Sequence, residues 1–340
     1  MRLVAIEEHF LPTEVRKAWD EAPGPLDPVS AVADGGINGE RLADLGKGRI
    51  ALMDEQGVDV QVLSLTTPGL HNLKKAPSVD LARRVNDSIA EVCSRYPTRF
   101  QGFAAIPTPD PDAAPLELER AVRELGLKGA LVCGRTRDRH LDHASFRPML
   151  AKAAELGAPI FIHPQTPLAE VREANYSGIS SKADLAIAAF AIGWHYEAGL
   201  QWLRLAAAGV FDELPTLQTI LGHWGELVLF YLERTSAVFA RTLELDRSLS
   251  DYARNNLYIT GSGMWSEAYL RRCLDIVGSS RLLFSTDFPY QYKPGGEPRR
   301  FLETIEIGDA DREAFAHGNW DRLTGAIVQP DGCLGRAMPR

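Results

Sequence analysis

The chain has 340 residues, of which 45% are hydrophobic and 24% are charged, a balance typical of a globular protein and not of a long disordered one. Its formal net charge is −8, and it has no cluster of lysines and arginines with interleaved aromatic residues, so we expect no binding to nucleic acid. No apolar run approaches the roughly 18 residues of a membrane span, and the first residues lack the features of a signal peptide, so we expect a cytoplasmic protein that makes no membrane contact.

Short apolar runs recur along the chain between longer segments with helical spacing. Eight of these runs have the length and composition of buried strands. They are Leu3 to His9, Val58 to Leu65, Phe100 to Ile106, Gly129 to Val132, Pro159 to His163, Leu217 to Gly222, Leu257 to Gly261 and Leu282 to Asp287. Segments such as 78–97 and 145–157 have apolar residues three and four apart, which predicts helices. Eight strands that alternate with helices predict an α/β fold, a (β/α)8 TIM barrel of the amidohydrolase-like kind described below.

Three irregular segments follow the ends of expected strands, near residues 20–40, 164–182 and 288–298. The first is rich in proline and glycine. A barrel places its active-site loops after the strands, so these segments are expected to be loop insertions near the site. We therefore expect a single barrel domain over residues 1–340, not two domains joined by a linker.

Polar groups that can bind or react lie at the ends of five of the eight expected strands. They are Glu7 and His9, His163, His223, the hydroxyls of Thr260 and Ser262, and Asp287. Strand ends converge at the C-terminal rim of a barrel, so these side chains should surround one point. Glu7 and His9 are two residues apart on a strand and face the same side, while Glu8 points away.

Two imidazoles and two carboxylates with an open coordination position suit a catalytic divalent metal. We expect Glu7, His9, His163 and Asp287 to hold one ion per chain. Zinc and manganese both fit, since imidazole suits zinc while carboxylate and water suit manganese. The alternative is a polar cluster closed by water and salt bridges.

Other acids and histidines have less certain roles on the sequence alone. His223 could be a fifth ligand or a base, or could cap the following helix. Glu226 and Glu197 lie in helix-like segments and could orient the histidines by hydrogen bonds, or could be solvated or cap helices. The role of His195 is undecided. Four histidines in loop or helical context are expected to be solvated: His71, His140, His143 and His317.

Several stretches of the sequence resemble the amidohydrolase superfamily (amidohydrolase-2 type), in the branch of γ-resorcylate (2,6-dihydroxybenzoate) and 2,3-dihydroxybenzoate-type aromatic acid decarboxylases. The similarity spans about residues 3 to 325. The stretches that carry it are VAIEEHF, ALMDEQGVDVQVLSL, ARRVNDSIAE, PTRFQGFAAIPTPDPDAA, FIHPQTP, AAAGVFDELPTLQTILGHWGE, NLYITGSG and LLFSTDFPY. Many amidohydrolases have HxH on the first strand, whereas this chain has Glu7-Glu8-His9, which favours the decarboxylase branch.

The resemblance implies the same four metal ligands and places His223 beside the substrate, a small aromatic carboxylate. It also implies a homo-oligomer, a dimer or a tetramer, because decarboxylases of this type are oligomeric. Within it, Arg234 would reach the carboxylate of a substrate bound to a neighbouring subunit. The alternative for Arg234 is an exposed helical side chain that pairs with Glu233 or with solvent.

The expected function is that of a carboxy-lyase, a metal-dependent non-oxidative decarboxylase of a hydroxylated aromatic acid in aromatic compound catabolism. Protonation of the ring carbon before CO2 leaves avoids an aryl carbanion, and Asp287 is the expected acid, with His223 orienting or relaying the proton. The alternative is a hydrolase of a lactone, an amide or a ring-cleavage product, since the same site can activate water. A non-catalytic binding protein is the least favoured reading. Residues 24–38, Trp194 and Tyr290 match the family poorly and are expected to set substrate identity.

Overall fold

The computed structural model describes residues 1–22, 27–30 and 35–327. The expected loop near residues 20–40 therefore lies partly outside the described residues, as does the segment 24–38 that we expect to set substrate identity. Of this region the structure describes α2 (Gly36–Ala43), whose first residues lie inside the expected loop.

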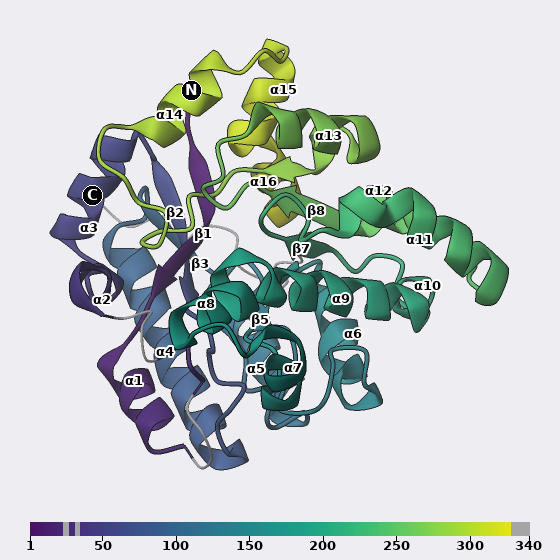
Figure 1. Ribbon diagram of the computed structural model, residues 1–340. Coiled ribbons are helices and arrows are strands. Elements are labelled where there is room, and N and C mark those ends of the chain that lie inside the picture. Colours follow the sequence, from purple (N-terminus) through teal and green to yellow (C-terminus); the bar gives the residue numbers. More distant parts are fainter. Residues whose placement is uncertain (23–26, 31–34, 328–340) are drawn as a thin grey trace.

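Parallel strands at the centre of the molecule form a closed barrel (Figure 1). In the described part of the chain the strand segments are β1 (Val4–Phe10), β2 (Val60–Leu65), β3 (Phe100–Gly102), β4 (Ala104–Ala105), β5 (Ala130–Cys133), β6 (Ile160–His163), β7 (Thr219–Leu221), β8 (Leu257–Thr260) and β9 (Leu282–Leu283). β3 and β4 are one barrel strand interrupted at Phe103. The barrel closes where the N–H of Ile6 donates to the carbonyl of Phe284, 3.0 Å away. The eight expected strands and the barrel are confirmed, most of the strands within narrower bounds.

Helices surround the barrel (Figure 1). Besides α2 they are α1 (Thr13–Asp20), α3 (Lys47–Gln56), α4 (Lys75–Arg95), α5 (Ala113–Arg123), α6 (Arg147–Leu156), α7 (Ala169–Tyr176), α8 (Ser181–Ala186), α9 (Gly193–Ala207), α10 (Val210–Glu213), α11 (Val228–Thr242), α12 (Leu249–Asn256), α13 (Glu267–Val277), α14 (Glu297–Thr304), α15 (Asp309–Glu313) and α16 (Asn319–Gly325). Short 3-10 turns are η1 (Ala144–Phe146) and η3 (Ser279–Arg281), and π turns are η2 (Ile187–Ala191) and η4 (Ala314–Gly318). Among the described helices, none combines the length and the apolar character that a membrane span requires.

Side chains fill the inside of the barrel, so its strands are buried on both faces. The interior cluster includes Ile6 and Phe161, and it is closed by Phe103 against Trp320 of α16, with ring centroids 5.5 Å apart. A larger apolar cluster lies between the strands and the helices. Burial on both faces explains why the strands are continuous apolar runs in the sequence.

A bulge in β1 sets which of its side chains enter the site. The register between β1 and β2 shifts between Ala5 and Glu8. An extra residue of this kind bends a strand and interrupts its alternation. Ile6 packs in the interior cluster, so strict alternation would direct Glu8 inward. The bulge instead lets Glu7 and His9 face the inside of the barrel, beyond Ile6.

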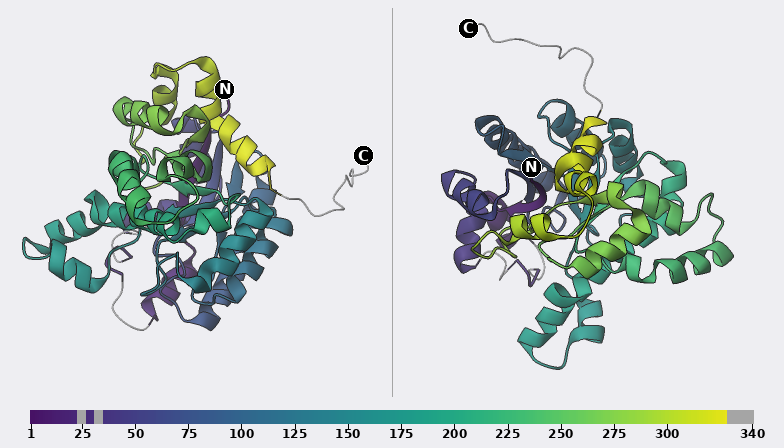
Figure 2. Two further views of the ribbon diagram at one scale, coloured as in Figure 1. Left: turned by 90° about the vertical axis from the view of Figure 1, so that its right-hand side faces the viewer. Right: turned by 90° about the horizontal axis from the view of Figure 1, so that it is seen from above.

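The segment 164–182, expected to be a loop, is largely helical, which corrects that expectation. It contains α7 and the start of α8, which extend away from the barrel in both views of Figure 2. Neither helix has a buried residue, so neither requires a row of apolar residues along one face. The apolar spacing from which helices are predicted is therefore absent from this segment. The segment 288–298 is irregular until α14 begins at Glu297.

Candidate functional site

Four side chains from distant parts of the chain meet at the C-terminal rim of the barrel. Glu7, His9 and His163 are buried, and one ligand atom of each lies within 4.8 Å of the others. His163 Nε2 lies 3.6 Å from Glu7 Oε1, and the rings of His9 and His163 meet edge to face, with centroids 4.8 Å apart. Asp287 follows β9, and its Oδ1 lies 3.3 Å from His9 Nε2. The structure thus brings together all four side chains that we expect to hold the metal.

These residues fit a divalent cation. Within the described residues, Glu7 Oε1 and His9 Nε2 are buried and have no hydrogen-bond partner. A buried polar atom left unpaired costs about 1–3 kcal/mol, so two of them at one point favour the binding of a cation there. Imidazole nitrogens mixed with carboxylate oxygens suit zinc or manganese.

Hydrogen bonds at the other ring nitrogens orient the two histidines. His163 Nδ1 lies 2.8 Å from the carbonyl of Pro164, and because a carbonyl only accepts, Nδ1 carries the hydrogen and Nε2 has a free lone pair. His9 Nδ1 lies 3.1 Å from Ser64 Oγ. Arg49, which is fully buried, donates to the carbonyl of His9 over 2.7 Å. Both Nε2 atoms therefore remain available at the rim.

Burial shifts the pKa values of these groups. Burial raises the pKa of Glu7 to about 8, although the nearby His223 acts in the opposite direction. Burial also lowers the pKa of His163 to about 3. At Asp287 burial would raise the pKa, but the neighbouring His223 and His9 lower it to about 2. A bound cation would stabilise the charged form of Glu7, so metal and carboxylate stabilise each other.

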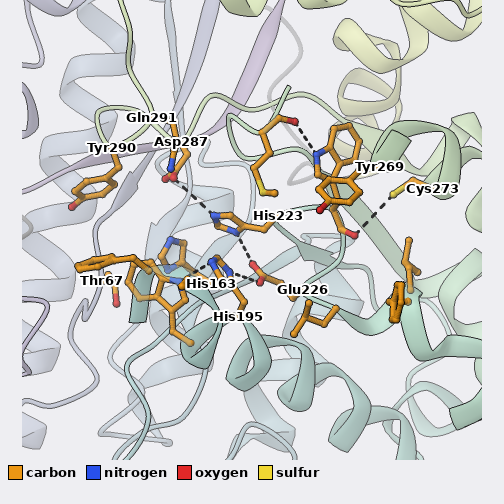
Figure 3. A pocket seen from close by; sticks show the side chains of 18 of the residues that line it. Thr67, His163, His195, His223, Glu226, Tyr269, Cys273, Asp287, Tyr290 and Gln291 are labelled. Atoms are coloured by element: carbon orange, nitrogen blue, oxygen red, sulfur yellow. Dashed lines mark hydrogen bonds and ion pairs between the residues drawn. The ribbon is translucent and has the colours of Figure 1, made fainter. Parts of the chain in front are cut away.

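A second cluster lies beside the first and shares contacts with it (Figure 3). Glu226 accepts hydrogen bonds from His223 Nδ1 over 2.7 Å and from His195 Nδ1 over 2.8 Å. His223 Nε2 faces Asp287 Oδ2 at 3.9 Å. Burial would raise the pKa of Glu226, but the two histidines lower it to about 2. Burial would lower the pKa of His223, yet Glu226 and Asp287 raise it well above its usual value. This arrangement can hold a proton on His223 next to Asp287.

The backbone is strained where it presents these groups. His223, Glu226, Ser262 and Asp287 have φ values of 45°, 50°, 47° and 54°, in the left-handed region that residues other than glycine rarely adopt. Each such residue costs on the order of 1–3 kcal/mol, and such residues concentrate at functional sites. Glu226 therefore lies in a strained turn between β7 and α11, not in a helix as the sequence suggested.

Glu8 points away from the cluster, as expected, and supports it from behind. Its carboxylate accepts from Gln61 Nε2 over 2.9 Å, and from the N–H and hydroxyl of Thr286 over 2.8 and 2.6 Å. Thr286 directly precedes Asp287. Glu8 thus holds the end of the last strand against the first, which fixes Asp287 opposite His9.

Two expectations are corrected by contacts in the structure. Glu197 is buried inside α9 and forms an ion pair with Arg135 at 3.3 Å, so it is neither solvated nor a helix cap, and its partner is an arginine instead of one of the histidines. His71 is buried, not solvated, and its Nε2 accepts from the N–H of Cys133 over 3.1 Å. His140, His143 and His317 are half-buried or exposed.

Arg234 lies on the exposed surface of α11 and does not line the cavity described next. Sequence reasoning missed the supporting roles of Ser64 and Arg49. Ser64 could have been recognised from the sequence, because it is a polar residue inside an apolar strand. Arg49 could not, because its contacts with β1 depend on how α3 packs. His195 was noticed, but its partner Glu226 is distant in sequence.

The described residues line a cavity of about 790 Å³ that opens onto both clusters. Its polar lining includes His163, His195, His223, Glu226 and Asp287 (Figure 3). Apolar residues line it too, among them Phe190, Leu229, Phe230 and Met264. A ligand that carries both a charged group and apolar groups fits this lining.

Comparisons with known proteins show which family the chain belongs to. A family model described as Amidohydrolase matches residues 7–323. The chain is 35% identical to the decarboxylase orsB of Emericella nidulans over 301 residues, 86% of this chain and 87% of that protein. The structure of 2,6-dihydroxybenzoate decarboxylase from Rhizobium complexed with 2,6-dihydroxybenzoate matches with 31% identity and a TM-score of 0.81, covering 96% of this chain and 99% of that one. A dihydroxybenzoic acid decarboxylase from Polaromonas sp., with bound manganese and the inhibitor 2-nitroresorcinol, matches with 32% identity and a TM-score of 0.82, covering 95% and 97%.

Proposed function

This chain belongs to the amidohydrolase family and is a metal-dependent non-oxidative decarboxylase of hydroxylated aromatic acids, and we propose that one divalent ion, held by Glu7, His9, His163 and Asp287, serves its reaction. The observation that carries this proposal is the position of Asp287. One of its oxygens lies 3.3 Å from His9 and the other 3.9 Å from His223. A single carboxylate thereby joins the expected metal site to a group that can supply a proton.

The ion would supply positive charge that binds the carboxylate and the ortho-hydroxyl oxygens of the substrate and stabilises negative charge on them. We propose manganese or zinc. Manganese is bound in the Polaromonas relative, and the mixed imidazole and carboxylate set also suits zinc.

The protein's own groups then deliver the proton. His223 holds a proton at Nε2, with its Nδ1–H donated to Glu226. Asp287 Oδ2 accepts this proton and passes it to the ring carbon that bears the carboxylate. When the bond from that carbon to the carboxylate breaks, its electron pair returns to the ring, and CO2 leaves. Solvent reprotonates His223 to complete the cycle.

The size of the cavity indicates a substituted substrate. A volume of about 790 Å³ lies in the upper part of the range of roughly 300–1,000 Å³ for ligand pockets, more than a single ring fills. We propose an aromatic carboxylate with an ortho hydroxyl whose apolar ring substituents contact apolar side chains of the cavity wall, such as Leu229 and Met264. A series of ortho-hydroxybenzoates with growing alkyl substituents tests this, and turnover of the unsubstituted acid alone would reject it.

We also propose a homo-oligomer in which Arg234 reaches the active site of a neighbouring subunit. Arg234 lies on α11 with Phe230 and Tyr231, which are 76% and 59% exposed and form an apolar surface that a second copy would cover. Light scattering should give a dimer or a tetramer, and Arg234→Ala should raise KM without loss of metal. A monomer with full activity would contradict this role.

Metal analysis tests the proposed site. Protein purified without chelator should contain one manganese or zinc ion per chain, and activity should follow the metal as it is removed and restored. Substoichiometric metal that does not rise with activity on adding manganese or zinc would contradict the proposal.

A further inference from the structure

His195 has two hydrogen-bond partners, one a donor and the other an acceptor. Trp194 Nε1 lies 2.9 Å from His195 Nε2, and Glu226 Oε2 lies 2.8 Å from His195 Nδ1. An indole N–H can only donate, and a carboxylate oxygen can only accept. His195 Nε2 is therefore the acceptor and Nδ1–H the donor, so the ring has one orientation and one tautomer in this arrangement.

Glu226 depends on both of its histidines. Its side chain is buried, and each carboxylate oxygen has one histidine donor, Oε1 from His223 and Oε2 from His195. The last torsion of a glutamate side chain has a broad, shallow preference, so a single donor leaves the carboxylate plane free to turn. The second donor, His195, fixes that plane, and removing it would leave a buried anionic oxygen unpaired.

The orientation of Glu226 determines that of His223. The bond at His223 Nδ1 sets how the ring is turned, and the ring presents Nε2 to Asp287 at 3.9 Å. The rings of His195 and His223 also pack against each other, with centroids 4.3 Å apart. Figure 3 shows the resulting chain of contacts from His195 through Glu226 and His223 to Asp287.

Two glycines allow α9 to carry His195 to this position. A Cβ on Gly199 would lie 2.2 Å from the carbonyl oxygen of Glu226, so only glycine lets the helix approach the strained turn so closely. A Cβ on Gly193 would lie 2.2 Å from the carbonyl oxygen of Ala188, where η2 meets α9. The contact at Gly199 places α9 against the turn that holds Glu226, and the contact at Gly193 packs η2 against the first residue of α9.

We propose that His195 is a positioning residue for the decarboxylation: it fixes the Glu226 carboxylate, and through it the His223 ring, while Trp194 ties this chain of contacts to the cavity wall. The inference rests on the proposed function for its effect on turnover. Its structural part, the fixing of His223 by His195, does not depend on the reaction.

Three variants of His195 distinguish a positioning role from a purely structural one. His195→Asn places an amide nitrogen where Nδ1 lies and keeps the donor to Glu226, whereas His195→Gln moves the amide one bond further out. His195→Ala removes the donor. We expect the alanine and glutamine variants to lose about 10–100-fold in kcat, the range typical of partners that orient a functional group. The asparagine variant should retain most of the wild-type kcat, and KM and metal content should stay near wild type in all three.

A second measurement does not require turnover. In 15N-histidine-labelled protein the His223 Nδ1–H, bonded to Glu226, should give a protected proton signal in the wild type and in His195→Asn, and should broaden or disappear in His195→Ala. Equal signals in all variants, or an alanine variant with wild-type kcat, would overturn the inference, and so would an equal loss of kcat in the alanine and asparagine variants. If the wild type decarboxylates no acid, the proposed function fails, and the proton signals alone decide the role of His195.

Discussion

The proposed reaction gives Asp287 two tasks that usually belong to different side chains. Its Oδ1 faces His9 in the expected metal site, and its Oδ2 faces His223, the expected source of the proton. The left-handed backbone at Asp287 and the support of Thr286 by Glu8 hold it between them. The roles of His163 and His223 on its two sides should therefore be separable by mutation.

Substitution of His163 and of His223 should have different consequences. His163→Ala removes an expected ligand and should lose metal and activity together. His223→Asn suits the left-handed backbone, because asparagine tolerates it, and its amide can keep the bond to Glu226. The asparagine lacks Nε2, so the variant should lose about 10²–10⁴-fold in kcat. It should keep the metal, because His223 is not one of the four expected ligands. Elemental analysis and steady-state kinetics of both variants test these two roles. Loss of metal from His223→Asn would show that His223 is a ligand.

The buried His71 should make the protein less stable in acid. Burial lowers its pKa from 6.5 in the unfolded chain to about 4 in the fold. Below pH 6.5 the unfolded chain therefore binds a proton that the folded one does not, so the free energy of unfolding falls as the pH falls from 6.5 toward 4, by on the order of 3 kcal/mol in total.

Denaturant unfolding over this pH range checks the effect of His71. His71→Gln keeps an acceptor for the N–H of Cys133 but cannot titrate, so its stability should fall less than that of the wild type. The exposed His143, replaced in His143→Gln, is the control. Parallel curves for the wild type and His71→Gln would show that His71 does not contribute.

Among the elements, β7 and β1 approach each other closely at the expected metal site. Gly222 follows β7, and a Cβ there would lie 2.7 Å from Ser262 Oγ and 3.2 Å from both carboxylate oxygens of Glu7. Ser262 in turn donates a hydrogen bond to Glu7. The absence of a side chain at Gly222 thus leaves room for Glu7 and for the hydroxyl that orients it.

Adding a methyl group at Gly222 should therefore weaken metal binding without unfolding the chain. Because φ at Gly222 is outside the left-handed region, Gly222→Ala fits the backbone, and its nearest contacts are with Ser262 and Glu7. We expect a loss of about 10–100-fold in manganese affinity, measured by competition with a chelator. Gly325→Ala, where a Cβ meets nothing within 4 Å, should bind like the wild type. Unchanged affinity in Gly222→Ala would show that Glu7 is not constrained as described.

The sequence predicts elements that are buried and misses those that are not. The strands are visible because both of their faces are apolar and their ends are polar, which also reveals Glu7, His9, His163 and Asp287. α7 and α8 are invisible because nothing in them is buried. The pairing of Glu197 with Arg135 could not be predicted, because it depends on the packing of α9 against a distant loop.

At the scale of the whole molecule, closure of the barrel assembles the site. The last strand pairs with the first through the bonds from Ile6 to Phe284 and from His9 to Phe288, and these bring Asp287 beside His9. The rim then opens into a cavity of about 790 Å³ lined by polar groups such as Asp287 and by apolar side chains. The fold therefore brings the proposed proton donor, the expected metal ligands and the cavity together.

In the proposed reaction Asp287 delivers a solvent-derived proton to the carbon that loses CO2. Metal-loaded enzyme incubated in D2O with ortho-hydroxybenzoates should release CO2 from at least one of them and form the phenol with one deuterium at the former carboxyl carbon, and Asp287→Asn should abolish both. A hydrolase would instead release no CO2 and incorporate oxygen from 18O-labelled water. That result, or near wild-type activity in Asp287→Asn, would contradict the account.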